Sequence, residues 1–283
     1  TTVAVANDVN LIGNNGAGAV LSITANANGP SLTADRVIIG ADATFNLSGI
    51  DGPLVQDRLL IDTRGGIQGE FATLNIGGFA GAVDYLAAST RKSTDGKQYL
   101  ATYGLSWTAN NSLAGGTFTL ADAGNRFTVG AALADQAANA ATGWNGKSLT
   151  KAGNGTLILT GANTYSGGTT ITGGTLQLGD GGKTGSISGN VVNQGMLAFN
   201  RGDTFTFAGD ISGNGALRQS GSGTTVLTGA NTHTGGTLVD GGTLRAGSAG
   251  AFAARTAYVV NGGTLDLNNH DLTMSALSGA GGT

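Results

Sequence analysis

The chain has 283 residues and contains 52 glycines but two prolines, a composition that excludes collagen and proline-rich disordered segments. Apolar residues form 40% of the chain, enough for a core. Charged residues form 11% and the formal net charge is −3, so no basic patch supports nucleic-acid binding.

Short runs rich in β-forming residues occur through the first half of the chain. They lie at residues 37–39, 44–47, 59–61 and 71–76. Their length and alternation predict strands, and we expect these strands to form irregular coils. The predicted organisation is a less regular region over residues 1–145 and a regular one over residues 146–283.

A hairpin is predicted within residues 86–107, because Asp95-Gly96 lies between two β-rich arms and favours a type I′ turn. Arg91, Lys92, Asp95 and Lys97 concentrate charge within this short stretch. We expect this hairpin to leave the main body of the fold and to be a salt-dependent binding candidate.

An alanine-rich segment at residues 131–142 has helical composition but weak helical periodicity, so it predicts a short helix or a loop excursion. Trp107 and Trp144 lie in the same irregular half. We expect their rings to fill a widened coil or to cap an excursion, with stacking on a sugar as the alternative.

The second half contains a 34-residue block twice, without gaps, at residues 149–182 and 217–250. Nineteen of the 34 positions are identical. Such self-similarity predicts a repeat architecture. The chain has no charged and apolar leader and no run of about 18 apolar residues, and it ends inside what looks like another repeat, so we expect an internal fragment. The absence of cysteine means little for a cytosolic protein, but in an exported one it favours a chain that must avoid disulfides in the periplasm before a later translocation in the unfolded state.

Equivalent leucines recur at a nearly constant spacing in this half. They are Leu157, Leu176, Leu197 and Leu217 in the first series, and Thr225, Leu244 and Leu265 form a second series. Helical repeats need longer units, so this period predicts an all-β parallel β-helix with about 20 residues per coil. Over the whole chain it would give roughly 14 coils spaced about 4.8 Å apart.

The corners between these strands contain turn residues. The glycine pairs Gly167/Gly168, Gly173/Gly174, Gly241/Gly242 and Gly262/Gly263 are expected to supply positive φ angles. Asn163 and Asn231 occupy equivalent turn positions and are expected to join ladders of stacked amides.

Catalytic chemistry is weakly supported. The two histidines are His233 and His270, and His233 replaces Tyr165 of the first copy, which predicts a surface residue. Glu70 is the single glutamate, and most of the 16 aspartates lie in turns rather than as an acid–base pair. No repeated calcium motif or phosphate-binding loop occurs. We therefore predict no catalytic residue, no cofactor and no metal.

One short motif favours binding. Arg201-Gly202-Asp203 is the tripeptide that integrins recognise, and it lies in a predicted turn that we expect to be exposed. The alternative is an ordinary polar turn.

Residues 153–179, GNGTLILTGANTYSGGTTITGGTLQLG, closely resemble the passenger-associated repeat of bacterial autotransporters. Residues 194–217 and 103–111 fit the same pattern. This resemblance implies a right-handed parallel β-helix on the bacterial surface or released from it, carried there by a C-terminal outer-membrane β-barrel absent from this fragment. It also implies a non-catalytic adhesin or self-associating protein, whose partner is a host-cell glycan or protein or the same passenger on another cell. The alternatives are a carbohydrate-active enzyme and a pure stalk.

Overall fold

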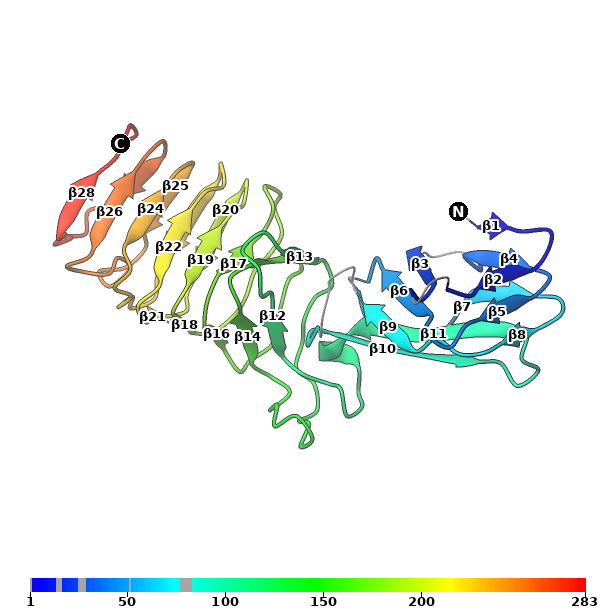
Figure 1. Cartoon of the computed structure of the whole chain (residues 1–283). Helices are drawn as coiled ribbons and strands as arrows, with labels where there is room; N and C mark the ends of the chain where they lie inside the picture. The colour runs from blue at the N-terminus through cyan, green and yellow to red at the C-terminus, as the bar shows by residue number, and fades with distance from the viewer. Residues whose placement is uncertain (1, 14–16, 25–28, 51, 77–82) are drawn as a thin grey trace. The chain divides into compact units, whose positions relative to one another are not determined.

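The computed structural model describes residues 2–13, 17–24, 29–50, 52–76 and 83–283, and the chain divides into two compact units, Thr1–Ala114 and Gly115–Thr283 (Figure 1). The described elements are strands apart from one 3-10 helix, Ser106–Thr108. No helix among the described residues is long and apolar enough to span a membrane. The predicted all-β parallel β-helix is confirmed.

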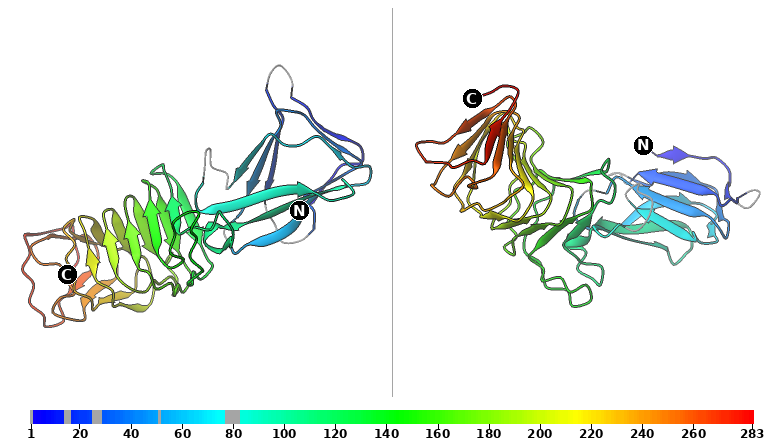
Figure 2. Two further views of the ribbon diagram at one scale, coloured as in Figure 1. Left: turned by 90° about the horizontal axis from the view of Figure 1, so that it is seen from below. Right: turned by 60° about the vertical axis from the view of Figure 1, so that its left-hand side comes forward.

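The second unit is built from three parallel sheets, and most coils contribute strands to two of them. The first face contains β12 (Thr117–Thr119), β14 (Leu149–Ala152), β16 (Thr169–Ile171), β18 (Val191–Asn193) and β21 (Ile211–Ser212). The second face contains β13 (Arg126–Val129), β15 (Thr156–Leu159), β17 (Thr175–Leu178), β19 (Met196–Phe199), β22 (Ala216–Gln219), β24 (Thr237–Val239), β26 (Ala257–Val260) and β28 (Ala276–Ser278). The third face contains β20 (Thr204–Phe207), β23 (Thr224–Leu227), β25 (Thr243–Ala246) and β27 (Thr264–Asp266). Figure 2 shows these strands stacked side by side.

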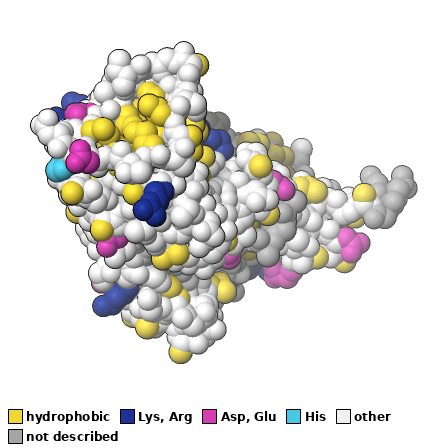
Figure 3. Space-filling view, turned by 90° about the vertical axis from the view of Figure 1, so that its left-hand side faces the viewer, with side chains coloured by type: hydrophobic (Ala, Val, Ile, Leu, Met, Phe, Trp, Pro, Cys, Tyr) yellow, Lys and Arg dark blue, Asp and Glu magenta, His cyan; other side chains and the backbone are white. Residues whose placement is uncertain are grey.

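The core of this unit consists of columns of like side chains. On the second face, Leu157, Leu176, Leu197 and Leu217 lie opposite one another in successive strands, and all four are fully buried. On the third face a column runs from Phe205 through Thr225 to Leu244 and Leu265. In this column Thr225 and Leu244 are buried, and Leu265 is half-buried. Seen from its C-terminal end, the unit shows hydrophobic side chains gathered at the centre and charged ones scattered around them (Figure 3).

The two sequence copies do not occupy the same faces. Leu149 of the first copy lies on the first face, whereas its counterpart Leu217 lies on the second. The strands β15 and β17 of the first copy lie on the second face, and their counterparts β23 and β25 lie on the third. The spacing between the copies therefore corresponds to three coils and one further face. The second copy is displaced by one face around the helix axis.

Glycines form the corners, for two different reasons. The second glycine of three predicted pairs has a positive φ, namely Gly168, Gly174 and Gly242, as expected. Neither Gly262 nor Gly263 does. A Cβ atom on Gly263 would instead lie 2.8 Å from the carbonyl oxygen of Gly242 in the preceding coil. At that corner the close approach of two backbones, rather than a left-handed conformation, requires glycine.

The first coil of the second unit is longer than the others. Phe127 pairs with Leu157, a longer step along the chain than the next one from Leu157 to Leu176, because residues 131–148 leave the helix. They form no helix. Asn139 and Trp144 make an isolated antiparallel bridge, and the indole N–H of Trp144 donates to the carbonyl of Ser148 at 2.8 Å. The loop excursion is confirmed and the short helix is wrong.

Both tryptophan rings are buried. Trp107 is 1% exposed and Trp144 is 9% exposed, so neither presents a face on which a sugar could stack. The structure therefore agrees with the expected packing role and contradicts the stacking alternative.

The first unit is also a parallel β-helix, with longer coils. Its three parallel stacks are β1 (Val3–Ala4), β4 (Leu32–Ala34) and β7 (Val55–Thr63); β2 (Val9–Leu11), β5 (Val37–Ile39) and β8 (Ile67–Gln68); and β3 (Val20–Thr24), β6 (Thr44–Ser48) and β9 (Thr73–Ile76). Leu32 pairs with Ile61, a longer step than that from Leu157 to Leu176 in the second unit. The estimate of roughly 14 equal coils for the whole chain is therefore wrong, although the predicted period holds in the second unit.

The predicted hairpin is present as β10 (Leu86–Lys92) and β11 (Gln98–Leu105), which pair antiparallel. Rather than standing free, β11 also pairs with β7, so the hairpin extends a sheet of the first unit. The type I′ turn is wrong, because that turn needs two positive φ angles and only Gly96 has one. The Asp95 carboxylate instead accepts hydrogen bonds from the Ser93 hydroxyl and the Lys97 N–H.

Replacing Leu176 with alanine should lower the free energy of unfolding by about 2–5 kcal/mol, because its neighbours Leu157 and Leu197 would border a cavity. Asp180→Ala is the control, since that side chain is exposed, and its effect should stay within about 0.5 kcal/mol. Urea denaturation of both variants measures the difference. Equal losses would contradict the inward stacking of Leu176.

Candidate functional site

The Arg201-Gly202-Asp203 turn connects β19 to β20 and is held by its arginine. Arg201 is only 8% exposed, so the expected exposure is wrong at this residue. Its guanidinium donates two hydrogen bonds to the Asp203 carboxylate, at 2.9 and 2.8 Å. Two more go to backbone carbonyls of the preceding coil, Gly185 at 2.8 Å and Lys183 at 2.5 Å. The guanidinium carbon also lies 4.6 Å from the centre of the Phe205 ring.

These contacts show that Arg201 stabilises the turn and the neighbouring coil. Its hydrogen bonds hold the pKa of Asp203 below its ordinary value, and its contacts with residues 183 and 185 fix the loop that precedes β18. A receptor that used this tripeptide would have to draw Arg201 out of four hydrogen bonds. Integrin recognition stays a hypothesis with this energetic cost attached.

The charged hairpin residues lie in the first unit, and most have partners. Arg91 pairs with Asp57 of β7 at 2.9 Å, and both side chains are about half exposed. The Lys92 ammonium contacts Glu70 at 2.8 Å and the Gly69 carbonyl at 2.8 Å. Because such exposed pairs are screened by salt, this cluster is suited to a salt-sensitive contact rather than to a tight one.

Asp95 and Lys97 lie apart from those pairs, at the turn of the hairpin. Hydrogen bonds from the Ser93 hydroxyl and the Lys97 N–H hold the pKa of Asp95 below its ordinary value. The Lys97 side chain is exposed. The four charged candidates of the hairpin therefore form two groups rather than one site.

The corner asparagines connect coils through backbone groups. The Asn163 oxygen accepts from the Leu133 N–H at 2.8 Å, and its amide donates to the Ser186 carbonyl at 2.8 Å. Asn231 makes the same pattern with Ile211 and Ala251. The predicted amide stack is wrong, because the two asparagines lie three coils and one face apart. Each instead links the coil before it to the coil after it.

His233 is buried, which contradicts the predicted surface position. It is 1% exposed, and its Nε2 lies 3.1 Å from the Thr237 hydroxyl. Tyr165 makes the equivalent contact with Thr169 at 2.7 Å, so both copies place a ring in the interior at this turn. Burial lowers the pKa of His233 to about 4 from its ordinary 6.5. Because its counterpart Tyr165 is also a buried ring, the ring at this turn has a structural role.

Polar side chains inside the corners were missed by sequence reasoning. The fully buried Lys151 ammonium donates to the carbonyls of Ala152, Gly153 and Gly173 at 2.7, 2.8 and 3.2 Å. Burial lowers its pKa to about 8. Its counterpart Gln219 donates to turn carbonyls in the same way. Alternation with Leu149 was the signal that could have identified the inward position of Lys151.

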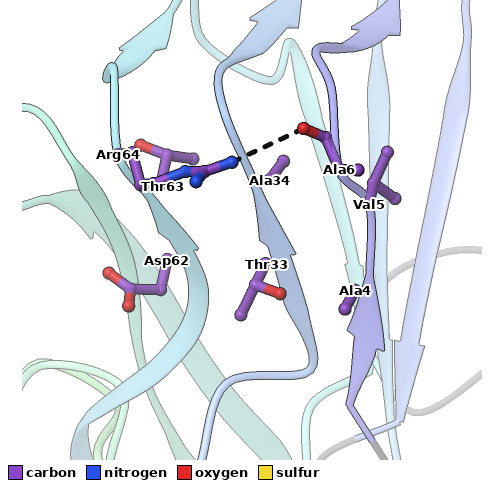
Figure 4. Close-up of a pocket in the computed structure, with 8 residues that line it drawn as sticks. All are labelled: Ala4, Val5, Ala6, Thr33, Ala34, Asp62, Thr63 and Arg64. Carbon is purple, nitrogen blue, oxygen red and sulfur yellow. Dashed lines mark hydrogen bonds between the residues drawn. The ribbon is translucent and has the colours of Figure 1, made fainter.

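Two recesses of the first unit contain carboxylates. The first, about 460 Å³, is lined by parts of β1, β4 and β7 and contains one carboxylate, Asp62 (Figure 4). Asp62 accepts a hydrogen bond from Gln98. The second contains Asp8 and Asp35, which pair with Arg36 and Arg64.

A glycosidase needs one carboxylic acid whose pKa is raised. Wherever a carboxyl pKa departs from its ordinary value in the described chain, hydrogen bonds lower it. These residues are Asp57, Asp95, Asp135 and Asp203. No group of three or more potential metal ligands occurs within the described residues.

Replacing Arg201 with alanine should lower the free energy of unfolding by about 2–4 kcal/mol, because buried carbonyls and Asp203 would lose their donor. Arg201→Lys should rescue it only in part, since lysine cannot form the two-pronged contact. Arg218→Ala is the matched control, because Arg218 pairs with Asp240 while 44% exposed, and should cost less than about 1 kcal/mol. Similar losses for Arg201→Ala and Arg218→Ala would contradict the anchoring role.

The free energy of unfolding should fall as pH falls from about 6.5 to about 4, because the unfolded chain binds a proton at His233 that the folded chain excludes. The full contribution is about 3 kcal/mol. His233→Tyr, which copies Tyr165, should remove that part of the pH dependence, whereas His270→Ala at a half-exposed histidine should retain it. Denaturation at several pH values compares them, and identical acid profiles for wild type and His233→Tyr would contradict the assignment.

Comparison with known proteins agrees with this geometry. Residues 149–178 and 217–246 match the family described as the passenger-associated-transport-repeat. Over 130 residues the chain is 44% identical to the adhesin BmaC autotransporter of Brucella suis biovar 1 (strain 1330). The match covers 45% of this chain and 3% of that protein, so the chain spans a small part of its relative's length. In its repeats and its β-helix, the chain resembles the passenger domain of a bacterial autotransporter.

Proposed function

We propose that this chain is part of a non-catalytic autotransporter passenger that lies on the bacterial surface, or is released from it, and mediates adhesion. The observation that carries the proposal is the adhesin named among its relatives, together with repeats that build the second unit. The partner is a host-cell glycan or protein, or the same passenger on a neighbouring cell.

The comparison of the two copies of the repeat supports adhesion through outward side chains. Identical positions of the two copies include inward residues such as Leu159 and Leu227, and the corner residues Asn163 and Asn231. Some outward positions carry different polar side chains in the two copies, as at Gln177 and Arg245. The coil therefore tolerates different outward side chains at such positions, which suits a binding scaffold.

Self-association through neutral hydrogen bonds would use rows of polar side chains, and the rows on the second and third faces are short. Thr156 and Thr175 stack on the second face, where Met196 and Ala216 then follow. A new threonine row, Thr204, Thr224, Thr243 and Thr264, runs along the third face. Because the copies are displaced by one face, one partner molecule meets a row of limited length. Avidity between many copies on a cell would have to multiply these weak contacts.

Cells that display the intact passenger should adhere to host cells or to one another, and deletion of this segment with its neighbours retained should abolish that adhesion. Adhesion should depend only mildly on salt, because 11% of the residues are charged. A length-matched β-helical replacement separates binding from spacing. Full adhesion with the replacement would favour a stalk, and sugar release by the purified chain would favour the carbohydrate-active enzyme.

A further inference from the structure

The outer surface of the first face is an ordered array of short polar side chains. Its two outward columns are Thr117, Thr150, Thr170, Val192 and Ser212, and Thr119, Ala152, Thr172, Gln194 and Asn214. The side chains between them, including Phe118, Lys151 and Ile171, are fully buried. We refer to these outward residues as the hydroxyl face.

This face is uncharged, unlike its neighbours. None of its residues carries a charge, whereas the second face presents the Arg218–Asp240 pair and the third presents Arg245 with Asp266. The hydroxyls of Thr150 and Thr170, which lie opposite each other in adjacent coils, form no hydrogen bond with any described residue. The surface therefore offers free donors and acceptors without an ion that must be desolvated.

The second copy shows that the fold does not require these hydroxyls. The counterparts of Thr150, Thr170 and Thr172 are Arg218, Leu238 and Asp240. Both triplets stand on the same strand–turn–strand backbone and point outward on a parallel sheet. The repeat therefore accepts a long cation, an aliphatic chain or an anion at these outward positions. The Thr172 hydroxyl donates to the Lys151 carbonyl at 3.2 Å, whereas those of Thr150 and Thr170 are available to a partner.

We propose that the hydroxyl face binds a neutral, extended polysaccharide that runs along the helix axis. Successive coils lie about 4.8 Å apart, close to the advance of one sugar in an extended β-linked chain, so each coil can meet one sugar. A neutral sugar matches the absence of charge, and its hydroxyls can pair with those of threonine. This inference rests on the proposed adhesive function and names its class of partner.

The expected affinity is modest. Each neutral hydrogen bond contributes about 1 kcal/mol, and no aromatic ring is among the large exposed apolar residues of the described chain, so no stacking platform adds to it. Binding to a single chain should therefore be weak and become strong only when many passengers meet a long polymer. A neutral contact should also persist at high salt.

Titration calorimetry of the full chain with cellohexaose tests the proposal, with heparin as the anionic comparison and amylose as the coiled neutral one. Cellohexaose should bind, heparin should not, and high salt should change neither result. The variant Thr150→Arg/Thr170→Leu/Thr172→Asp should bind at least tenfold more weakly, while its circular dichroism stays that of the wild type. The matched control, Arg218→Thr/Leu238→Thr/Asp240→Thr, changes the second face and should bind as the wild type does.

Three results would overturn the inference: failure of the wild type to bind cellohexaose at millimolar concentration, preference for heparin, or unchanged binding by the first triple variant. Adhesion of cells displaying that variant distinguishes this inference from the function on which it rests. Persistent adhesion without glycan binding would leave the adhesive function intact and move its partner to another face, as expected for a protein ligand. If deletion of the segment left both glycan binding and adhesion unchanged, the inference and the adhesive function would both be contradicted.

Discussion

The constraint on which the second unit depends is the in-register stacking of each coil on the one before it. A shift of one residue would turn every inward side chain outward, so each strand must repeat the alternation of its neighbour. Leu157, Leu176, Leu197 and Leu217 satisfy this requirement in four consecutive strands. The corners must be equally tight. A Cβ atom at Gly174 would lie 2.4 Å from the Gly155 carbonyl oxygen, so the corner glycines are as necessary as the leucines.

The displacement of the second copy by one face is compatible with the in-register stacking of the coils. A strand on any of the three faces needs inward apolar residues and a glycine corner. A copy of the repeat can therefore form strands on any face. Leu149 and Leu217 are both fully buried although they belong to different sheets. What changes is the direction in which outward residues point. Repetition of the sequence therefore does not produce a repeated surface on one side of the helix.

The sequence allowed the strands, the length of the regular coils and the inward leucines to be predicted because the repeat makes them periodic. The longer coils of the first unit could not be predicted, since no repeat there sets a period. The burial of side chains at the corners could not be predicted from the sequence either. His233 and Arg201 follow turn residues and look exposed. In the structure the His233 ring lies inside against the Thr237 hydroxyl, and Arg201 donates to the Gly185 carbonyl of the preceding coil. Such contacts join residues that alternation within one strand does not relate.

Buried polar side chains complete the corners. The turns leave carbonyl oxygens pointing into the helix. An apolar residue at Lys151 would remove the ammonium donor from those of Gly153 and Gly173, at about 1–3 kcal/mol each. Gln219 meets the same need in the second copy with an uncharged amide. The requirement is therefore for a donor and not for a charge. Because Lys151 and Gln219 supply these donors from within the helix, outward residues such as Thr150 and Thr170 are not needed for that purpose and remain available for recognition of a partner.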